Sequence, residues 1–159
     1  MDDEGNQKMY NGTMSHPYFS ATEHSCDAVV LGCMDFRFWQ AIVNYIQQQL
    51  GYSTFDLITE AGGTKALAEH TGEIYDDLLR ELTIASTLHH IKTIILVNHE
   101  DCGGYGGKSA FASNALEREQ HRMHLAQTKQ ILRKRYPTAN VIALFAFFTQ
   151  NGIDFETVE

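Results

Sequence analysis

The chain of 159 residues is long enough for one domain with a sizeable core, and 43% of its residues are hydrophobic. Its net charge of −8 argues against nucleic acid or an anionic membrane surface as the main partner. Three cysteines are too few for a disulfide scaffold, so we expect free thiols and a cytoplasmic protein.

The chain is expected to consist of an N-terminal arm and one domain. Residues 1–25 are polar, lack periodic hydrophobicity and contain no apolar core of a secretory signal. The most apolar run, VIALFAFF at 141–148, is too short to span a membrane. Residues 26–159 contain no internal linker or repeat, which favours a single domain there.

After the arm, the predicted elements alternate between strands and helices. Short apolar runs predict strands over 27–33, 54–63, 92–98 and 139–148. Apolar residues at helical spacing, together with a long charged stretch, predict helices over 37–51, 73–91 and 113–136. Asn151-Gly152 then indicates a hairpin into a last short strand with Phe155 and Val158.

This alternation predicts an α/β fold. We expect a doubly wound, mainly parallel sheet of four strands, a C-terminal antiparallel edge strand, and helices on both faces. Ligands of such sheets bind beyond the carboxyl ends of the strands, where the chain winding reverses. If the first and third strands are neighbours there, the segments that follow them face each other. Gly62 and Gly63, after the second strand, would face the same crevice.

Reactive side chains follow two of these strands. GCMDFRF carries Cys33, Asp35 and Arg37, and NHEDCGG carries His99 and Cys102. Two thiolates, one imidazole and one open position form a known pattern for catalytic zinc. The sequence therefore predicts a Zn²⁺ site, and the glycines after Cys102 would let the backbone wrap around the ion. The alternative is two buried thiols and a loop histidine.

Asp35 and Arg37 form a second feature of this site. Two residues apart in an extended segment, they point the same way, and an arginine can hold a carboxylate by two parallel hydrogen bonds. Held by Arg37, Asp35 could orient a water molecule at the metal. Released, it could bind the metal and close the site. We expect Asp35 and Arg37 to be a catalytic dyad rather than a structural ion pair. The sequence leaves open whether Asp35 is held by Arg37 or bound to the metal.

Other polar residues are weaker candidates. Cys26 is expected to be a small packed residue rather than a fourth ligand. His121 and His124 lie three residues apart on the charged helix, and a solvated face is expected for them. Glu100 and Asp101 lie inside the metal loop, where they could support the ligands or be exposed turn carboxylates.

The motifs C-M-D-F-R, A-G-G and H-E-D-C-G-G, in this order, resemble those of the β-class carbonic anhydrases. The pattern of that family is C-x-D-x-R, an A-G turn and H-x-x-C-G. The resemblance covers about residues 27–159, including the helix and strand before His99 and the closing hairpin.

The resemblance implies a fold, a site and an activity. By this resemblance, the zinc ligands of the chain would be Cys33, His99 and Cys102, and Asp35 and Arg37 would be the catalytic dyad. It implies reversible hydration of the small molecule CO₂ to bicarbonate and a proton. It also implies a homodimer or higher homo-oligomer, with the arms crossing to the partner.

The chain departs from the family pattern beside the expected site. The family usually has R-N-A-G where this chain has Thr59-Glu60-Ala61-Gly62, so Glu60 adds a negative charge. Phe36 replaces a small residue and would narrow the pocket. Two alternatives therefore accompany CO₂ hydration: hydrolysis of CS₂ or COS at the same zinc, and a catalytically inactive, zinc-stabilised binding module.

Overall fold

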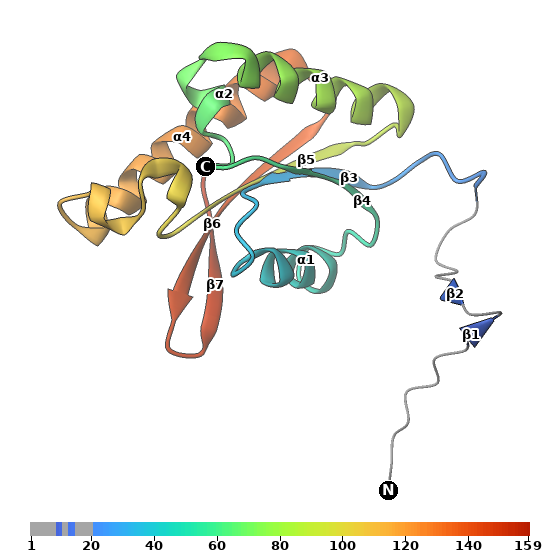
Figure 1. Cartoon of the computed structure of the whole chain (residues 1–159). Coiled ribbons are helices and arrows are strands. Elements are labelled where there is room, and N and C mark those ends of the chain that lie inside the picture. The colour runs from blue at the N-terminus through green and yellow to red at the C-terminus, as the bar shows by residue number, and fades with distance from the viewer. Residues whose placement is uncertain (1–8, 11–12, 15–20) are drawn as a thin grey trace, which may run out of the picture.

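The structure is a computed structural model that describes residues 9–10, 13–14 and 21–159 (Figure 1). Its strands are β1 (Met9–Tyr10), β2 (Thr13–Met14), β3 (Ala28–Gly32), β4 (Phe55–Thr59), β5 (Thr93–His99), β6 (Asn140–Thr149) and β7 (Gly152–Thr157). Its α-helices are α1 (Trp39–Gln48), α2 (Lys65–Glu69), α3 (Gly72–Leu88) and α4 (Asn114–Arg135). Two short 3₁₀ turns, Gly103–Tyr105 and Lys108–Ala110, connect β5 to α4.

Five strands form the central sheet in the order β4-β3-β5-β6-β7. The first four strands are parallel, and β7 pairs with β6 in the antiparallel sense. The chain winds outward from β3 to β4 and then returns to β5 on the other side of β3. The switch point therefore lies between β3 and β5, where Gly32 pairs with Val97. The predicted fold class is confirmed.

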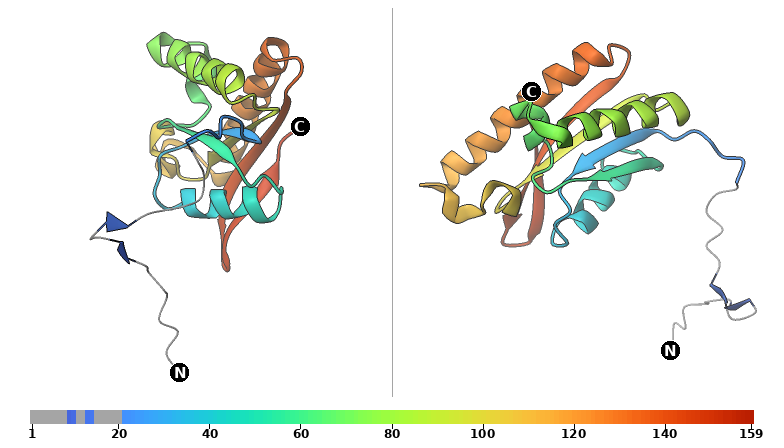
Figure 2. Two further views of the ribbon diagram at one scale, coloured as in Figure 1. Left: turned by 90° about the vertical axis from the view of Figure 1, so that its right-hand side faces the viewer. Right: turned by 45° about the horizontal axis from the view of Figure 1, so that its top comes forward.

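Helices cover both faces of the sheet, with α1 on one face and α2, α3 and α4 on the other (Figure 2). Successive side chains of a strand point to opposite faces. Val29 and Leu31 of β3 accordingly belong to the core beneath α3 and α4, whereas Val30 packs in the core beneath α1. Ile42 and Ile46, four residues apart on α1, complete that second core because they lie on one side of the helix.

The structure differs from the predicted elements mainly at their ends, where backbone conformation determines whether a strand or helix continues. The second predicted strand ends at Thr59, because Gly62 (φ 92°) and Gly63 (φ 57°) turn the chain into α2, which was not predicted. Val158 lies just beyond β7, although its N–H still donates to Ala143 O (2.8 Å). In the arm, β1 and β2 pair as a two-stranded sheet, and the rest of residues 1–20 lies outside the described residues.

The inner face of α4 is polar, which corrects one expectation. His121 and His124 were expected on a solvated face, but they are 0% and 6% exposed. The buried residues of α4 recur at helical spacing: Glu117, His121, His124, Leu125, Thr128, Lys129 and Leu132. They face inward because α4 packs against β6, β5 and α2. A search for apolar periodicity misses such a stripe, because five of its seven members are polar.

All three cysteines of the chain are free thiols. Within the part of the chain that the structure describes, no helix is both long enough and apolar enough to cross a bilayer.

Candidate active site and metal centre

Cys33, His99 and Cys102 meet at the carboxyl ends of β3 and β5. Cys33 directly follows β3, His99 is the last residue of β5, and Cys102 lies in the loop after it. Their ligand atoms all lie within 4.8 Å of one another, and the two sulfur atoms are 3.8 Å apart. All three side chains are buried. The adjacent pairing of β3 and β5 brings these residues together, since parallel strands end at the same edge.

The imidazole of His99 is oriented to accept a cation. Its Nδ1 donates to the carbonyl oxygen of Glu100 (2.7 Å), which leaves the lone pair on Nε2. This Nε2 is buried and has no hydrogen-bond partner among the described residues. The ring also packs against Phe38, with centroids 4.2 Å apart. A buried acceptor without a partner costs free energy, and a metal ion at Nε2 would remove that cost.

The two thiols are suited to share a cation. The Cys102 thiol donates to Cys33 Sγ, which lowers the pKa of Cys33 and, together with burial, raises the pKa of Cys102. Both sulfurs can be thiolates at this distance only if a positive charge lies beside them. Two thiolates and one imidazole suit a borderline divalent metal ion such as Zn²⁺. The residues present therefore fit a metal centre.

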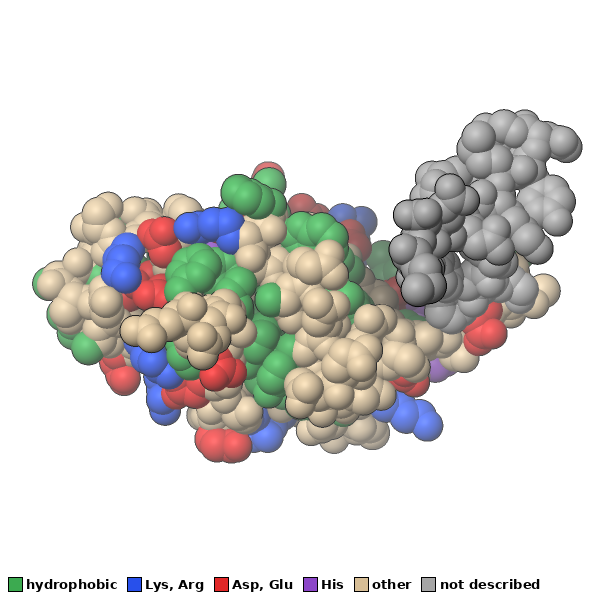
Figure 3. Space-filling model, turned by 90° about the horizontal axis from the view of Figure 1, so that it is seen from below, with side chains coloured by type: hydrophobic (Ala, Val, Ile, Leu, Met, Phe, Trp, Pro, Cys, Tyr) green, Lys and Arg blue, Asp and Glu red, His purple; other side chains and the backbone are tan. Residues whose placement is uncertain are grey.

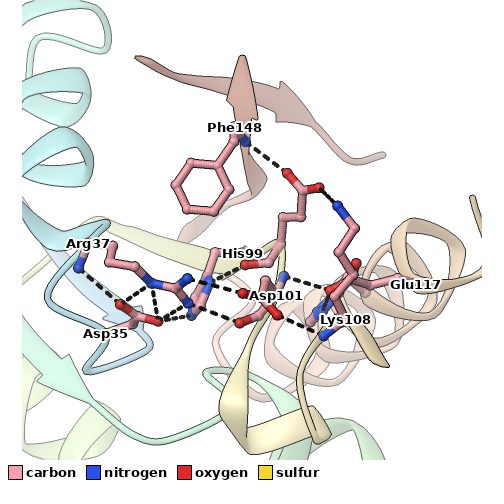
Figure 4. Close-up of polar contacts among 9 residues, drawn as sticks. Asp35, Arg37, His99, Asp101, Lys108, Glu117 and Phe148 are labelled. Atoms are coloured by element: carbon pink, nitrogen blue, oxygen red, sulfur yellow. Dashed lines mark hydrogen bonds and ion pairs between the residues drawn. The ribbon is translucent and has the colours of Figure 1, made fainter. Parts of the chain in front are cut away.

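Asp35 and Arg37 lie beside these ligands as a hydrogen-bonded pair (Figure 4). Arg37 Nε donates to Asp35 Oδ1 (3.0 Å), and Arg37 Nη2 donates to Oδ2 (2.6 Å). Hydrogen bonds from the Arg37 side chain lower the pKa of Asp35 to about 2. Asp35 Oδ2 is 4.0 Å from His99 Nε2. The carboxylate is thus ionised, anchored by Arg37, and next to the candidate metal position.

Asp101 holds the other side of the Arg37 guanidinium. Arg37 Nη1 donates to Asp101 Oδ2 (3.1 Å), and Nη2 donates to the Asp101 carbonyl oxygen (3.1 Å). Asp101 Oδ1 also accepts from the Lys108 backbone N–H (2.8 Å). Asp101 adopts φ 55°, a left-handed conformation that aspartate tolerates better than most residues. Of the two roles left open for Asp101, support of the site is the one its contacts fit.

Glu117 is a site neighbour that sequence reasoning missed. Its Oε1 accepts from the Asp101 backbone N–H (2.6 Å), and its side chain is 1% exposed. Burial raises the pKa of Glu117. Contacts therefore run from α4 through Glu117, Asp101 and Arg37 to Asp35. The only available signal was its spacing, four residues before His121 on one helix face.

Glu100 also supports the loop after β5. Its Oε2 accepts from the Phe148 backbone N–H (2.9 Å), and its Oε1 accepts from Lys108 Nζ (3.2 Å). The residue thus links the loop that carries the candidate ligands to the end of β6.

Two glycine turns pack backbone against backbone beneath the site. A Cβ on Gly104 would lie 2.5 Å from the Gly62 Cα, which is closer than any real contact. Nearby, Asn98 Oδ1 accepts from both the N–H and the hydroxyl of Thr64, each at 3.0 Å. Asn98 Nδ2 donates to the Tyr105 hydroxyl (3.2 Å). The predicted placement of the glycine turn after β4 at this crevice agrees with these contacts.

Three other residues singled out in the sequence are not among the candidate ligands of this metal centre. Phe36, between the two members of the dyad, is 80% exposed. Glu60 lines a groove of about 330 Å³ between β4 and α3. Cys26 packs against the edge of the core, as expected, rather than against Cys33.

The sequence matches the model of a known protein family. The model of the "Putative carbonic anhydrase" family matches residues 23–158. An uncharacterized protein of Rickettsia bellii is 27% identical over 128 residues, which is 76% of this chain and 76% of that protein. An uncharacterized protein of Rickettsia conorii is 24% identical over 144 residues, covering 86% of this chain and 75% of that protein.

Solved structures show the same fold. A carbonic anhydrase from Glaciozyma antarctica aligns with a TM-score of 0.55 and 16% identity, covering 99% of this chain and 89% of that chain. β-Carbonic anhydrase isoform I from Trichomonas vaginalis aligns with a TM-score of 0.52 and 15% identity, covering 86% and 84%. These identities are low, so the likeness concerns the fold. The family match over residues 23–158 shows that the chain belongs to the putative carbonic anhydrase family, and the chain shares the fold of a solved β-carbonic anhydrase.

Proposed function

We propose that the protein is a zinc-dependent carbonic anhydrase that converts CO₂ and water reversibly to bicarbonate and a proton. One observation carries the proposal. Asp35, held by Arg37, has its Oδ2 4.0 Å from His99 Nε2, beside two buried thiols, and this Nε2 has no hydrogen-bond partner in the described part of the chain. A purely structural zinc site is closed by four protein ligands. A carboxylate anchored next to three ligands instead leaves a position for reacting molecules.

The three buried side chains Cys33, His99 and Cys102 would hold the zinc ion, with the thiols as thiolates and His99 bound through Nε2. When bound, zinc lowers the pKa of water, which supplies a nucleophile near neutral pH. Glu100 contributes through its backbone, because its carbonyl fixes the imidazole orientation.

Asp35 would orient the nucleophile. With a pKa of about 2 it is ionised at neutral pH and can only accept hydrogen bonds. It would accept the hydrogen of the attacking hydroxyl group and so direct the oxygen lone pair toward the carbon of CO₂. Arg37 keeps Asp35 in this place through its two side-chain hydrogen bonds. The proton released in the reaction would pass to the solvent buffer.

The proposal includes a cytoplasmic homodimer. A reducing compartment keeps the free thiols that the metal needs. Four large apolar side chains are exposed around the dyad: Met34, Phe36, Trp39 and Phe148. Phe148 packs against Phe38, so the patch continues from the segment before α1 to β6. The lower face of the molecule shows exposed hydrophobic side chains between charged ones (Figure 3). A second copy of the chain would cover this patch.

The test combines zinc content with reaction rates for the wild type and Asp35→Asn. The purified wild type should contain zinc and hydrate CO₂ in a stopped-flow assay. Asp35→Asn should keep its zinc and lose about 100-fold or more in kcat, because it removes the charged acceptor. Asp77→Asn, on the exposed surface of α3, is the matched control and should keep the wild-type rate.

Two results would contradict the proposal. Zinc-loaded protein that hydrolyses COS but does not hydrate CO₂ would reassign the substrate. Zinc-loaded protein inactive on both substrates would identify a zinc-stabilised binding module.

A further inference from the structure

A second set of metal-binding side chains lies at the other end of the sheet. Cys26 precedes β3, Asp56 is the second residue of β4, and His89 follows α3. Their ligand atoms also lie within 4.8 Å of one another. The start of β3 and the end of α3 are at the right of Figure 1, whereas the loop after β5 is at the left. The second cluster lies near the amino ends of the parallel strands, whereas the Cys33–His99–Cys102 cluster lies at their carboxyl ends.

The backbone fixes these three residues relative to one another. The Cys26 N–H donates to His89 O (3.1 Å), so the segment before β3 is tied to the end of α3. The N–H of Asp27 donates to Thr54 O (3.1 Å), which ties the same segment to the start of β4. His89 Nδ1 lies 2.7 Å from Asp56 Oδ2. Backbone hydrogen bonds of the folded domain therefore hold the three residues of the cluster close together.

The cluster is open to an ion from solvent. Its three residues line a pocket of about 330 Å³, together with Glu23 and His24, which offer further ligand atoms. The side chains of His89 and Asp56 are 40% and 30% exposed. An exposed ion pair of this kind stabilises the fold only slightly. A metal ion that replaces the contact between His89 and Asp56 therefore costs little folding free energy.

The charges and donor types of the cluster favour a transition metal. Asp56, Asp27 and Glu23 give this end of the sheet a local excess of carboxylates. The Cys26 thiol donates to the Ala28 carbonyl oxygen (3.4 Å), so it carries its proton when no metal is bound. An incoming dication displaces the thiol proton to solvent and forms a metal–sulfur bond. Sulfur and imidazole ligands select Zn²⁺ or Co²⁺ over Mg²⁺ or Ca²⁺.

We propose that Cys26, Asp56 and His89 form a second binding site for a divalent transition metal ion, separate from the Cys33–His99–Cys102 centre. One thiolate, one imidazole and one carboxylate bind the ion, and Glu23, His24 or water completes its coordination. With one thiolate rather than two and with exposed ligands, this site is the weaker of the two. The site does not depend on the activity proposed above.

The experiment counts metal ions bound per chain. Full-length protein without an affinity tag is titrated with Co²⁺, and the sulfur-to-cobalt charge-transfer absorption is followed along with the bound metal after dialysis. The wild type should bind two ions in two steps of different affinity. Cys26→Ala and His89→Ala should each weaken the second step by about tenfold or more, and Cys26→Ala should also remove its charge-transfer absorption. His70→Ala removes an exposed histidine outside the cluster and should leave both steps intact.

Two outcomes would overturn the second site: a wild type that binds one ion, or a second step that survives in both Cys26→Ala and His89→Ala. The double variant Cys33→Ser/Cys102→Ser distinguishes the two sites, because it should still bind one ion at the second site. Adding Cys26→Ala to this variant should abolish that binding. If that variant does not fold, the single variants in the intact chain decide. Failure to hydrate CO₂ by protein that binds two ions would contradict the proposed function and leave this site standing.

Discussion

At the scale of single residues, the candidate site depends on how each carboxylate is held. Asp35 is ionised because Arg37 donates to both its oxygens. Asp101 accepts from the same guanidinium, and Glu117 holds the Asp101 backbone. The position of Asp35 is therefore set by contacts that begin in the core face of α4.

Asp101→Asn should lower kcat/KM for CO₂ hydration by about tenfold, which corresponds to about 1.4 kcal/mol. Asparagine keeps an oxygen for the Lys108 N–H but removes the charge that faces Arg37. Steady-state rates at constant zinc content measure the effect. Unchanged kinetics would show that Asp35 alone positions the guanidinium.

Glu117→Gln should change the pH dependence of stability. Below about pH 4, the ordinary pKa of glutamate, Glu117 is protonated in the folded and the unfolded chain. Burial raises its pKa in the folded chain, so above that pH the unfolded chain ionises first. The free energy of unfolding of the wild type then falls with rising pH until the folded carboxyl also ionises. Glutamine keeps the acceptor for the Asp101 N–H and does not ionise.

The stability of Glu117→Gln relative to the wild type should therefore increase between pH 4 and neutral pH. Denaturant unfolding at several pH values, with equal zinc content, measures the difference. Glu119→Gln, on the exposed side of the same helix, is the control and should show no such trend. A difference for Glu117→Gln that is constant with pH would contradict the expectation.

At the scale of elements, the site is assembled by strand order and close-packed glycine turns. The adjacent ends of β3 and β5 bring Cys33 and His99 together. The turn after β4 approaches through Gly62, and the loop after β5 approaches through Gly104. The two backbones pack directly against each other, since a Cβ on Gly104 would lie 2.5 Å from the Gly62 Cα.

Gly104→Ala should destabilise the fold by about 1–3 kcal/mol and weaken metal binding, because its Cβ would overlap the Gly62 backbone. Gly103→Ala is the matched control, since a Cβ there meets nothing within 4 Å. Thermal unfolding and zinc affinity of both variants provide the comparison. If both substitutions lowered stability and zinc affinity equally, the close contact between the Gly104 and Gly62 backbones would not be what matters.

At the scale of the whole molecule, the apolar patch around the dyad is the feature that concerns assembly. The proposed homodimer would bury Phe36, which is 80% exposed in the single chain. The narrowing of the pocket expected from Phe36 stays a prediction. In a dimer, Phe36 would contact the second copy.

Phe36→Ser should raise the dissociation constant of the homodimer by about tenfold, because it removes one large buried side chain. Sedimentation equilibrium over a dilution series measures the change. Leu88→Ser is the control: Leu88 is 61% exposed at the end of α3, far from the patch. A monomeric wild type, or equal effects of both substitutions, would contradict the proposed interface.

The sequence predicted the fold well, because its strong signals are local. The buried strands, the alternation with helices and the hairpin at Asn151-Gly152 all appear in the structure. Helix α2 was missed because its five residues are too few for a periodic pattern, and it starts only because Gly62 and Gly63 turn the chain. The buried face of α4 was missed because its members are mostly polar.

By itself, the sequence determined the α/β fold, the family and which residues would come together at the strand ends. It could do so because Cys33, Asp35 and Arg37 follow one buried strand, His99 and Cys102 lie at the end of another, and parallel strands place such ends side by side. Only the tertiary structure decided that Arg37 also donates to Asp101, and what holds Asp101 in turn. Glu117 reaches Asp101 because α4 packs against β5 and β6, a contact between distant segments that leaves no local pattern in the chain.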